Sequence, residues 1–528
     1  MLWLAGGLLA LVLALPAHAE DGPPARVGEV SFAAGNAGWH APGAAWSDAA
    51  VNQPVAAGAG LRTDPQGKAE LRLGPLTIRL AEGTTVEIGR LDAEAAQIAL
   101  PHGRIALELA QLGDGQSVEI DLPRGGVWLL QPGEYDIDAG TAEVASRVAA
   151  LAGDARFIGK GADLELKPGQ AALLSGSGAI AGTVEPAPAA DAFVEWCRSR
   201  AVDETRLAAL YHISREVSGY QELDAHGDWA VAPEYGAIWY PRDLPADWVP
   251  YRYGHWAWIA PWGWSWIDDR SWGFATAHYG RWARIGERWG WVPGAVVPHP
   301  VYAPALVAFI GTPGIGLSVP DGAGPAIGWF PLAPGEVYWP GYTRDIDAIR
   351  QLNAGAVADL ETIREAPYGG PPGEIVNGRF ANREFATVIP RAVFAAAKPV
   401  APALLSLPEQ RIAQAPVIMG SPQLPPPGPH RIVALATIWP RAGLRPSSPF
   451  AGAQLRRWAF APSRHFAHFP TPHPSFGHGR AVAARPHPPL PPPLAARLHA
   501  PAYPPPARSS HFGAGGRAHM AAARGPAR

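Results

Sequence analysis

Glycine and proline together make up more than one fifth of this 528-residue chain, with 60 Gly and 59 Pro. Both residues interrupt helices and mark turns, so their abundance argues against a fold built from long helices. Nearly half of the residues are hydrophobic, which is enough to build cores over much of the length. The composition therefore favours a mainly β chain of about two to four domains, with at least one segment that lacks a fixed structure.

Short alternating runs between residues 26 and 180 predict one β domain. In each run hydrophobic and polar residues alternate, as in a strand with one buried face, and Gly, Pro or Asp separates successive runs. We expect a β-sandwich or β-roll, followed by an Ala/Pro/Gly linker at 176–190. The runs are 70–73, 76–80, 85–88, 103–109, 117–122, 126–130 and 134–138, with a last strand at 171–174.

Two segments of this domain resemble the FecR-type domain. Residues 60–73 read Gly-Leu-Arg-Thr-Asp-Pro-Gln-Gly-Lys-Ala-Glu-Leu-Arg-Leu, in which a Gly, an Arg-Thr pair and a small-residue turn lead into an alternating strand. Residues 166–170, Leu-Lys-Pro-Gly-Gln, resemble the closing turn of that domain. The resemblance covers about 26–180 and implies a FecR-type β domain. FecR proteins are iron-signalling transducers with a membrane span ahead of this domain. In this chain we expect a signal peptide in that place.

Residues 1–19 are typical of a secretory signal peptide. A short apolar run ends in Ala17-His18-Ala19, an A-x-A cleavage signature, although no Lys or Arg precedes the run. The run is shorter than the roughly 20 apolar residues that span a bilayer. We therefore expect export to the periplasm, with an uncleaved signal anchor or secretion as alternatives.

Residues 191–217 predict a short helical connector, because apolar residues recur there at helical spacing. Asp203 and Glu204 are candidate caps for a second helix within the connector. Cys197, the only cysteine, cannot form an internal disulfide. We expect it to be a small buried hydrophobe rather than a nucleophile.

Residues 219–400 predict a Trp-rich β domain. Twelve of the 21 tryptophans lie between Trp229 and Trp291. Two copies of one pattern stand out, one over 253–264 and one over 279–291, each with an aromatic run, a turn and a Trp-Gly-Trp. Each copy predicts a β-hairpin.

This segment also resembles a Trp-rich domain of unknown function found in exported proteobacterial proteins, where it often follows a FecR-type domain. The resemblance brings no established activity. It rests on residues 219–229, 235–241, 250–256, 262–269 and 272–274, and continues weakly through 328–332 and 388–394.

The tryptophans of the two hairpins allow two interpretations. They can fill the thin core of small hairpins, which we favour for most of them, or they can expose indole faces that stack on sugars or peptide side chains while arginines bind anionic groups. The candidate ligand surface consists of Trp256, Trp258, Trp262, Trp264, Trp266, Trp282, Trp289, Trp291, Arg252 and Arg281, with Arg284 as a further candidate for anionic groups.

Catalytic and metal sites are weakly indicated. Asp268, Asp269 and Glu287 are candidate acid–base carboxylates, but neighbouring residues on a strand point to opposite faces, so we expect the aspartates to lie in a turn. His255 and His278 lack the spacing of metal ligands. We find no motif of a hydrolase, nucleotide-binding loop, zinc protease or dinucleotide fold, and predict no enzyme, no cofactor and no metal site.

Residues 401–528 predict a disordered basic tail rich in Pro, Arg and His. It contains one acidic residue, Glu409, and no lysine, while the preceding residues are acidic. Proline runs favour an extended chain, and the histidines, such as His465 and His468, are weak metal chelators at most.

Together these patterns predict a non-enzymatic exported envelope protein with a binding or scaffold role. We expect an anionic envelope polymer or an envelope protein as partner, peripheral membrane contact at most, and no nucleic acid. Alternatives are a regulatory or sensory partner in envelope signalling derived from FecR ancestry, and a glycan-binding or glycan-active protein. The oligomeric state stays open.

Overall fold

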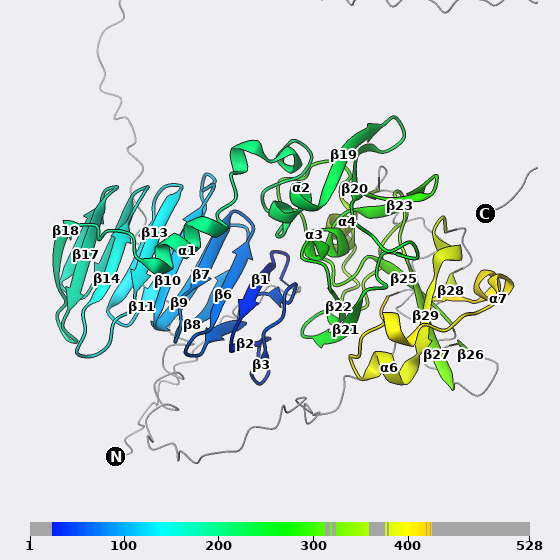
Figure 1. Cartoon of the computed structure of the whole chain (residues 1–528), viewed down its shortest axis with the longest axis horizontal. Helices are drawn as coiled ribbons and strands as arrows, with labels where there is room; N and C mark the ends of the chain where they lie inside the picture. The colour runs from blue at the N-terminus through cyan, green and yellow to red at the C-terminus, as the bar shows by residue number, and fades with distance from the viewer. Residues whose placement is uncertain are drawn as a thin grey trace, which may run out of the picture. The chain divides into compact units, whose positions relative to one another are not determined.

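The computed structural model describes residues 24–311, 317–318, 324–357, 375–376, 380–418, 420–422 and 424 (Figure 1). The predicted signal peptide and residues 425–528 of the predicted tail lie outside the described residues. The described part is mainly β, as the sequence predicted.

Two nine-stranded sheets form the first β domain. Sheet A contains, in spatial order, β18 (Ala181–Pro186), β17 (Gln170–Ser175), β14 (Ser146–Ala150), β13 (Gly133–Asp138), β10 (Arg104–Leu109), β7 (Leu76–Leu80), β6 (Lys68–Leu73), β1 (Gly28–Ala34) and β4 (Pro54–Val55). Sheet B contains β16 (Ala162–Leu166), β15 (Ala155–Gly159), β12 (Gly125–Leu129), β11 (Ser117–Leu122), β9 (Ala95–His102), β8 (Thr85–Leu91), β5 (Gly60–Thr63), β2 (Ala37–His40) and β3 (Ser47–Asp48).

The alternation that predicted these strands also explains their packing. In β7, Leu76, Ile78 and Leu80 are buried in the core, while Thr77 and Arg79 point to the opposite face. The chain crosses repeatedly between the two sheets, and all pairings are antiparallel except that of β9 with β11. One sequence prediction needs correction, because β18 lies inside the predicted linker 176–190. Its largely exposed pattern carries little hydrophobic alternation, so the sequence did not mark it as a strand.

The connector begins with α1 (Ala192–Arg200), which is capped by the Asp191 carboxylate. Val194 and Cys197 are the buried residues of α1. Burial raises the pKa of the Cys197 thiol to about 12, so it stays protonated and unreactive. Two 3-10 turns follow (Glu204–Arg206 and Ala208–Tyr211), and Asp203 caps the first of them. None of the described helices is long and apolar enough to cross a membrane.

The Trp-rich domain contains a four-stranded sheet, a separate hairpin and a six-stranded sheet. The four-stranded sheet contains β19 (Gly227–Ala232), β20 (Gly236–Pro241), β24 (Arg288–Val292) and β23 (Arg281–Ile285). The hairpin consists of β21 (Gly254–Ile259) and β22 (Gly263–Asp268). The last sheet contains β26 (Leu317–Ser318), β27 (Pro325–Pro331), β25 (Val307–Ile310), β30 (Val417–Ile418) and β28 (Ile375–Val376), with β29 (Thr387–Pro390) on β27.

Short helices connect these strands in the described residues. They are α2 (Leu223–His226), α3 (Gly273–His278), α4 (Ile346–Asn353), α6 (Arg391–Ala395) and α7 (Glu409–Gln414), together with 3-10 turns at Tyr220–Glu222, Arg383–Phe385 and Ala401–Ala403. This short-element architecture is the outcome that the Gly and Pro content favoured.

The ordered fold extends past the predicted start of the tail at residue 401. Strand β30 pairs with both β25 and β28, and Val417 and Ile418 are buried. Helix α7 contributes Ile412 to the core. The Pro and Ala content of 401–424 concealed these elements, because each is only two to six residues long.

We expect Ile418→Ala to lower the free energy of unfolding by about 2 kcal/mol, since it removes a buried side chain from the pairing of β30 with β25. Urea denaturation of the variant and the parent measures this difference. The same experiment on Leu404→Ala, at a residue that is 38% exposed, serves as the control and should show a smaller loss. Equal and negligible effects would mean that 401–424 belongs to the tail after all.

Candidate functional site

Both predicted hairpins form, but their tryptophans lie inside the protein. Seven of the eight tryptophans of the candidate ligand surface are exposed by 5% or less, and Trp258 alone among them is 40% exposed. Strand β22 is buried on both faces, since Ser265 is as inaccessible as its neighbours Trp264 and Trp266. The prediction of an exposed indole surface is therefore wrong for these residues. Alternate residues of β22 point to the same face, but both faces of the strand are covered, so neither face is in solvent.

Trp256 shows how the first hairpin is held. Its ring packs against Trp266, with which it pairs across the hairpin, at 5.6 Å between centroids. It also contacts Phe309 at 5.2 Å, Trp329 at 5.4 Å and Phe394 at 5.3 Å, which come from β25, β27 and α6. The hairpin therefore packs on the six-stranded sheet through aromatic edge and tilted contacts.

The candidate arginines also serve the fold. Arg281 is buried and donates to the Asn353 side chain at 2.7 Å and to the main-chain oxygens of Glu336 and Gly280. Burial lowers its pKa to about 10, so it still carries its charge at neutral pH. Arg252 is partly buried and donates to the Asp247 main-chain oxygen at 2.8 Å. Arg281 is inaccessible to an anionic ligand.

The candidate carboxylates do not form a catalytic pair. The Asp268 carboxylate accepts from the Trp266 indole and from the Arg270 main-chain amide, both at 2.9 Å, and burial raises its pKa to about 7. Asp269 follows β22 and is exposed, as the turn prediction requires. Glu287 is exposed in the β23–β24 turn, and no hydrogen bond or ion pair in the described structure joins it to either aspartate.

Of the two candidate histidines, His278 belongs to the core. His278 is buried, shares a hydrogen bond of 2.7 Å between Nδ1 and the Ala303 oxygen, and packs on Phe274 and Tyr302. Burial lowers the His278 pKa to about 3 and also lowers the His255 pKa, so both stay neutral at pH 7. The described residues contain no group of three or more side chains that could hold a metal ion.

The sequence did not point to the junction between the two β domains, where several direct contacts join them. The Asn52 side-chain amide donates to the main-chain oxygens of Asp268 at 2.8 Å and Arg270 at 2.6 Å. Arg72 of β6 forms an ion pair with Glu222 at 2.7 Å. We call this set of contacts the seam.

A buried charge network lies beside the seam on the outer face of sheet A. Glu70 is fully buried and accepts from Arg79 at 2.8 Å and from Arg200 of α1 at 3.1 Å, while Arg72 lies 3.2 Å away. Burial alone would raise the Glu70 pKa, but the three guanidinium groups outweigh it and hold the pKa at about 2. The network anchors α1 to the sheet.

Glu29 of β1 lies in this network without a cation in close contact. It has no exposed surface, and neither carboxylate oxygen accepts a hydrogen bond in the described structure. Its closest cation is Arg72, at 3.9 Å, which already serves Glu70 and Glu222. Burial therefore raises the Glu29 pKa to about 8, and the neighbouring carboxylates add to the effect, so Glu29 is mostly protonated at pH 7.

A cleft of about 520 Å³ opens beside the seam. A volume between roughly 300 and 1,000 Å³ is typical of ligand sites. Four segments line it: the β8–β9 turn at 93–94, the β10–β11 loop at 111–116, the connector at 213–216, and residues 298–299 after β24. Segments that are far apart in the sequence, and that belong to both β domains, therefore meet at one site.

The cleft has an excess of negative charge in its walls. Glu94, Asp114 and Glu216 contribute carboxylates to its walls. Glu216 pairs with Arg26 at 3.0 Å, and Arg215 in the wall pairs with a glutamate of the connector. The arrangement suits a partner that donates hydrogen bonds or carries positive charge, and disfavours a free anion.

The sequence carried only a weak signal for these residues. Glu70, Arg72 and Arg79 occupy the polar positions of alternating strands, which normally face water. Opposite charges on adjacent strands hint at pairing, but nothing in the pattern shows that α1 and the Trp-rich domain cover them. The cleft loops have ordinary turn compositions.

Comparison with known proteins identifies one part of the chain. Residues 220–336, which contain both Trp hairpins, match a family of unknown function, DUF6600. No curated protein matches the chain. Two crystal structures of a candidate anti-sigma factor from Parabacteroides distasonis share 12% and 13% identity with it, each over 24% of this chain and 60% of the other, with a TM-score of 0.22. A TM-score this low supports no conclusion about this chain. Residues 220–336 are a match to DUF6600, a family of unknown function.

Proposed function

We propose that this protein is an exported, non-enzymatic component of a bacterial envelope that binds or scaffolds other envelope components. In this proposal the first β domain is of the FecR type. The support is the sequence resemblance of the residues in β5, in β6 and in the turn before β17. The observation that carries the proposal is the acidic cleft of about 520 Å³, whose walls come from both β domains and from the connector between them.

Binding rather than catalysis is supported by the roles of the polar side chains. The carboxylates that the sequence offered for acid–base chemistry lie in turns or are held by hydrogen bonds to Trp266 and the Arg270 amide, and His278, weighed as a metal ligand, lies in the core. In the cleft, Glu216 is held by Arg26, and Gln116 donates to Glu216 at 3.3 Å. Such an array positions hydrogen-bonding groups around a partner, as in a recognition site.

The acidic cleft and the basic tail suit different chemical groups. The cleft favours hydroxyl, amide or ammonium groups, whereas the arginines of 425–528 favour phosphate or carboxylate groups. A scaffold with both can bridge peptidoglycan and an anionic polymer or lipopolysaccharide. The tail contact is electrostatic and should weaken as salt rises.

Sedimentation with purified peptidoglycan and lipopolysaccharide tests both attachments. Deletion of 425–528 should abolish salt-sensitive binding to lipopolysaccharide, and it leaves β30 in place. Asp114→Lys should weaken peptidoglycan binding by the rest of the chain about tenfold, through a reversed charge in the cleft, which corresponds to roughly 1.4 kcal/mol.

Glu143→Lys, an exposed charge reversal in the loop between β13 and β14, is the matched control and should bind as the parent does. If both lysine variants bind peptidoglycan equally, the cleft is not the site. If neither polymer is retained by the full chain, an envelope protein replaces them as the partner.

A further inference from the structure

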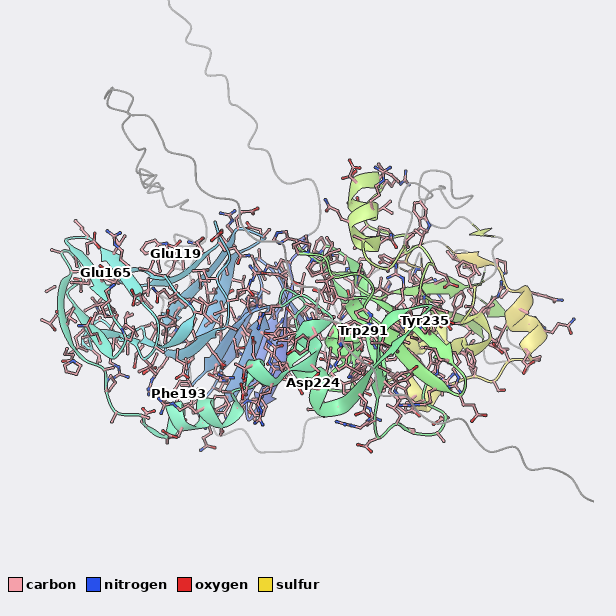
Figure 2. All side chains as sticks on the ribbon, turned by 90° about the horizontal axis from the view of Figure 1, so that it is seen from above. Glu119, Glu165, Phe193, Asp224, Tyr235 and Trp291 are labelled. Carbon is pink, nitrogen blue, oxygen red and sulfur yellow. The ribbon has the colours of Figure 1, made fainter. Side chains whose placement is uncertain are left out.

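Glu29 of β1 is covered by a segment of the Trp-rich domain. It lies directly opposite Arg72 in the pairing of β1 with β6. A Cβ at Gly219 would lie 3.3 Å from the Glu29 Oε2 atom and 3.2 Å from the Ala275 main-chain nitrogen, so Gly219 and α3 close over the carboxyl group. In both Figure 1 and Figure 2, α2, which carries Asp224 and follows this segment, lies between the strands of the two β domains.

Charged and titratable groups approach Glu29 from three directions. Arg72 and Glu70 belong to β6, Glu222 to the 3-10 turn before α2, and Tyr279 follows α3. Arg72 is 3.9 Å from Glu29, but 3.2 Å from Glu70 and 2.7 Å from Glu222. Arg72 therefore neutralises the other two carboxylates first, and their negative charges oppose a third.

An ionised Glu29 is incompatible with this closed arrangement. Neither carboxylate oxygen accepts a hydrogen bond in the described structure, and no part of the residue reaches solvent. An ionised carboxylate with no hydrogen bond and no close cation is strongly disfavoured away from water. Glu29 can therefore either keep a proton or gain water, and water reaches it only if Gly219 and α3 move away from β1.

Exchangeable hydrogen bonds bridge the two domains beside Glu29. The Ser218 hydroxyl donates to the Val27 main-chain oxygen at 2.9 Å and accepts from the Gly74 amide at 3.1 Å. The Tyr302 amide donates to the Ala25 oxygen at 3.0 Å. Such bonds can be replaced by bonds to water at a modest net cost, so a local opening here leaves the strand pairing of both domains intact.

We propose that the seam is a pH-dependent contact: ionisation of Glu29 opens it, and Gly219 and α3 separate from β1 while both β domains stay folded. Opening releases one proton, because Glu29 is protonated in the closed form and ionised in water. The device goes beyond the envelope binding proposed above and does not depend on it. Since the walls of the cleft come from both domains, a rise in pH should also take the cleft apart.

Proton release fixes how the opening depends on pH. The pKa of Glu29 is about 8 in the closed form and should be near its ordinary value of 4.5 once water reaches the group. The open population should therefore grow about tenfold per pH unit between these two values. It should be constant below pH 4.5 and level off above about pH 8.

Hydrogen–deuterium exchange of the full chain, measured at single amides between pH 4.5 and pH 8, tests the opening. The reporters are the amides of Gly74 and Tyr302, whose hydrogen bonds cross between the domains. The comparisons are Leu107 in sheet A and Trp329 in the six-stranded sheet, both buried. The two reporters should be protected about tenfold less, or weaker still, than the comparisons. Equal protection at all four amides would mean that only global unfolding exposes Glu29, and the proposal would fail.

Glu29→Gln shows whether Glu29 is the group that titrates. The protection of Gly74 and Tyr302 in the parent, divided by that in the variant, should fall about tenfold per pH unit, and this ratio cancels the intrinsic pH dependence of exchange. Glu185→Gln changes an exposed glutamate of β18, at the opposite edge of sheet A, and should match the parent. A ratio for Glu29→Gln that stays constant over the pH range would overturn the proposal.

Glu222→Gln separates the charge effect from a loss of packing. It removes one negative charge near Glu29 and frees Arg72 from its 2.7 Å ion pair, so Glu29 should ionise more readily in the closed form. The rise in exchange at Gly74 should then level off at a lower pH than in the parent, even though the lost ion pair favours opening at every pH. An unchanged levelling point would mean that the titrating group does not sense the charges around Glu29, against the proposal.

Discussion

Trp256→Ala should lower the free energy of unfolding by roughly 3 to 5 kcal/mol, the cost of removing a large buried aromatic side chain. The residue is 1% exposed and packs on four aromatic rings from four other elements. Its loss leaves a cavity that the surrounding rings cannot close, since they are fixed by their own strands. Chemical denaturation followed by near-ultraviolet circular dichroism measures the loss.

Trp258→Ala is the matched control in the same strand. Trp258 is 40% exposed and has one aromatic neighbour, Trp264 at 5.6 Å, so its loss should cost about 1 kcal/mol or less. The two results together decide between a core and a ligand surface. If Trp256→Ala kept full stability but lost binding to an envelope polymer, the indoles of this hairpin would have to be accessible after all.

The parent protein should lose stability as the pH rises, because buried Glu29 resists ionisation. Glu29→Gln should abolish this loss. The folded-state pKa of Glu29, about 8, lies above the ordinary value of 4.5, so the folded protein binds a proton that the unfolded chain releases. The contribution of Glu29 is fully present below pH 4.5 and is lost as pH rises to about 8, at about 1.4 kcal/mol per pH unit.

The expected difference between the variant and the parent follows from this sign. Glutamine cannot ionise, so the stability of Glu29→Gln relative to the parent should increase between pH 4.5 and pH 8, by on the order of 3 to 5 kcal/mol in total. Below pH 4.5 the difference should be constant. Urea denaturation at several pH values measures it, and subtraction of the parent cancels the titration of other groups, including Asp268.

Glu143→Gln provides the comparison for an exposed glutamate and should track the parent at every pH. A pH-independent difference for Glu29→Gln would show that Glu29 is ionised in the folded state, with Arg72 as its partner. In that outcome the variant should also be less stable than the parent at pH 7, because it would leave part of the Arg72 charge unpaired.

Much of the fold could be read from local pattern. The alternation over 76–80 and 117–122 predicted β7 and β11 with the bounds that the structure has, and the doubled Trp pattern predicted both hairpins. These predictions succeed because strand periodicity and turn residues act within a few neighbours along the chain. Where the pattern was weak, as in β18 and β30, the strands were missed, since their pairing comes from distant partners.

The sequence by itself determined that the chain is mainly β, where most strands of the first domain lie, that two Trp hairpins follow, and that the charge is divided between an acidic body and a basic tail. Only the tertiary structure decided which polar residues are buried. Glu29, Glu70 and Asp268 occupy positions that local pattern assigns to solvent, and they change their ionisation because another element covers them. Burial and charge pairing depend on contacts between segments that are far apart in the sequence, such as the contact of Asn52 with Arg270 across 218 residues, and such contacts leave no periodic trace in the sequence.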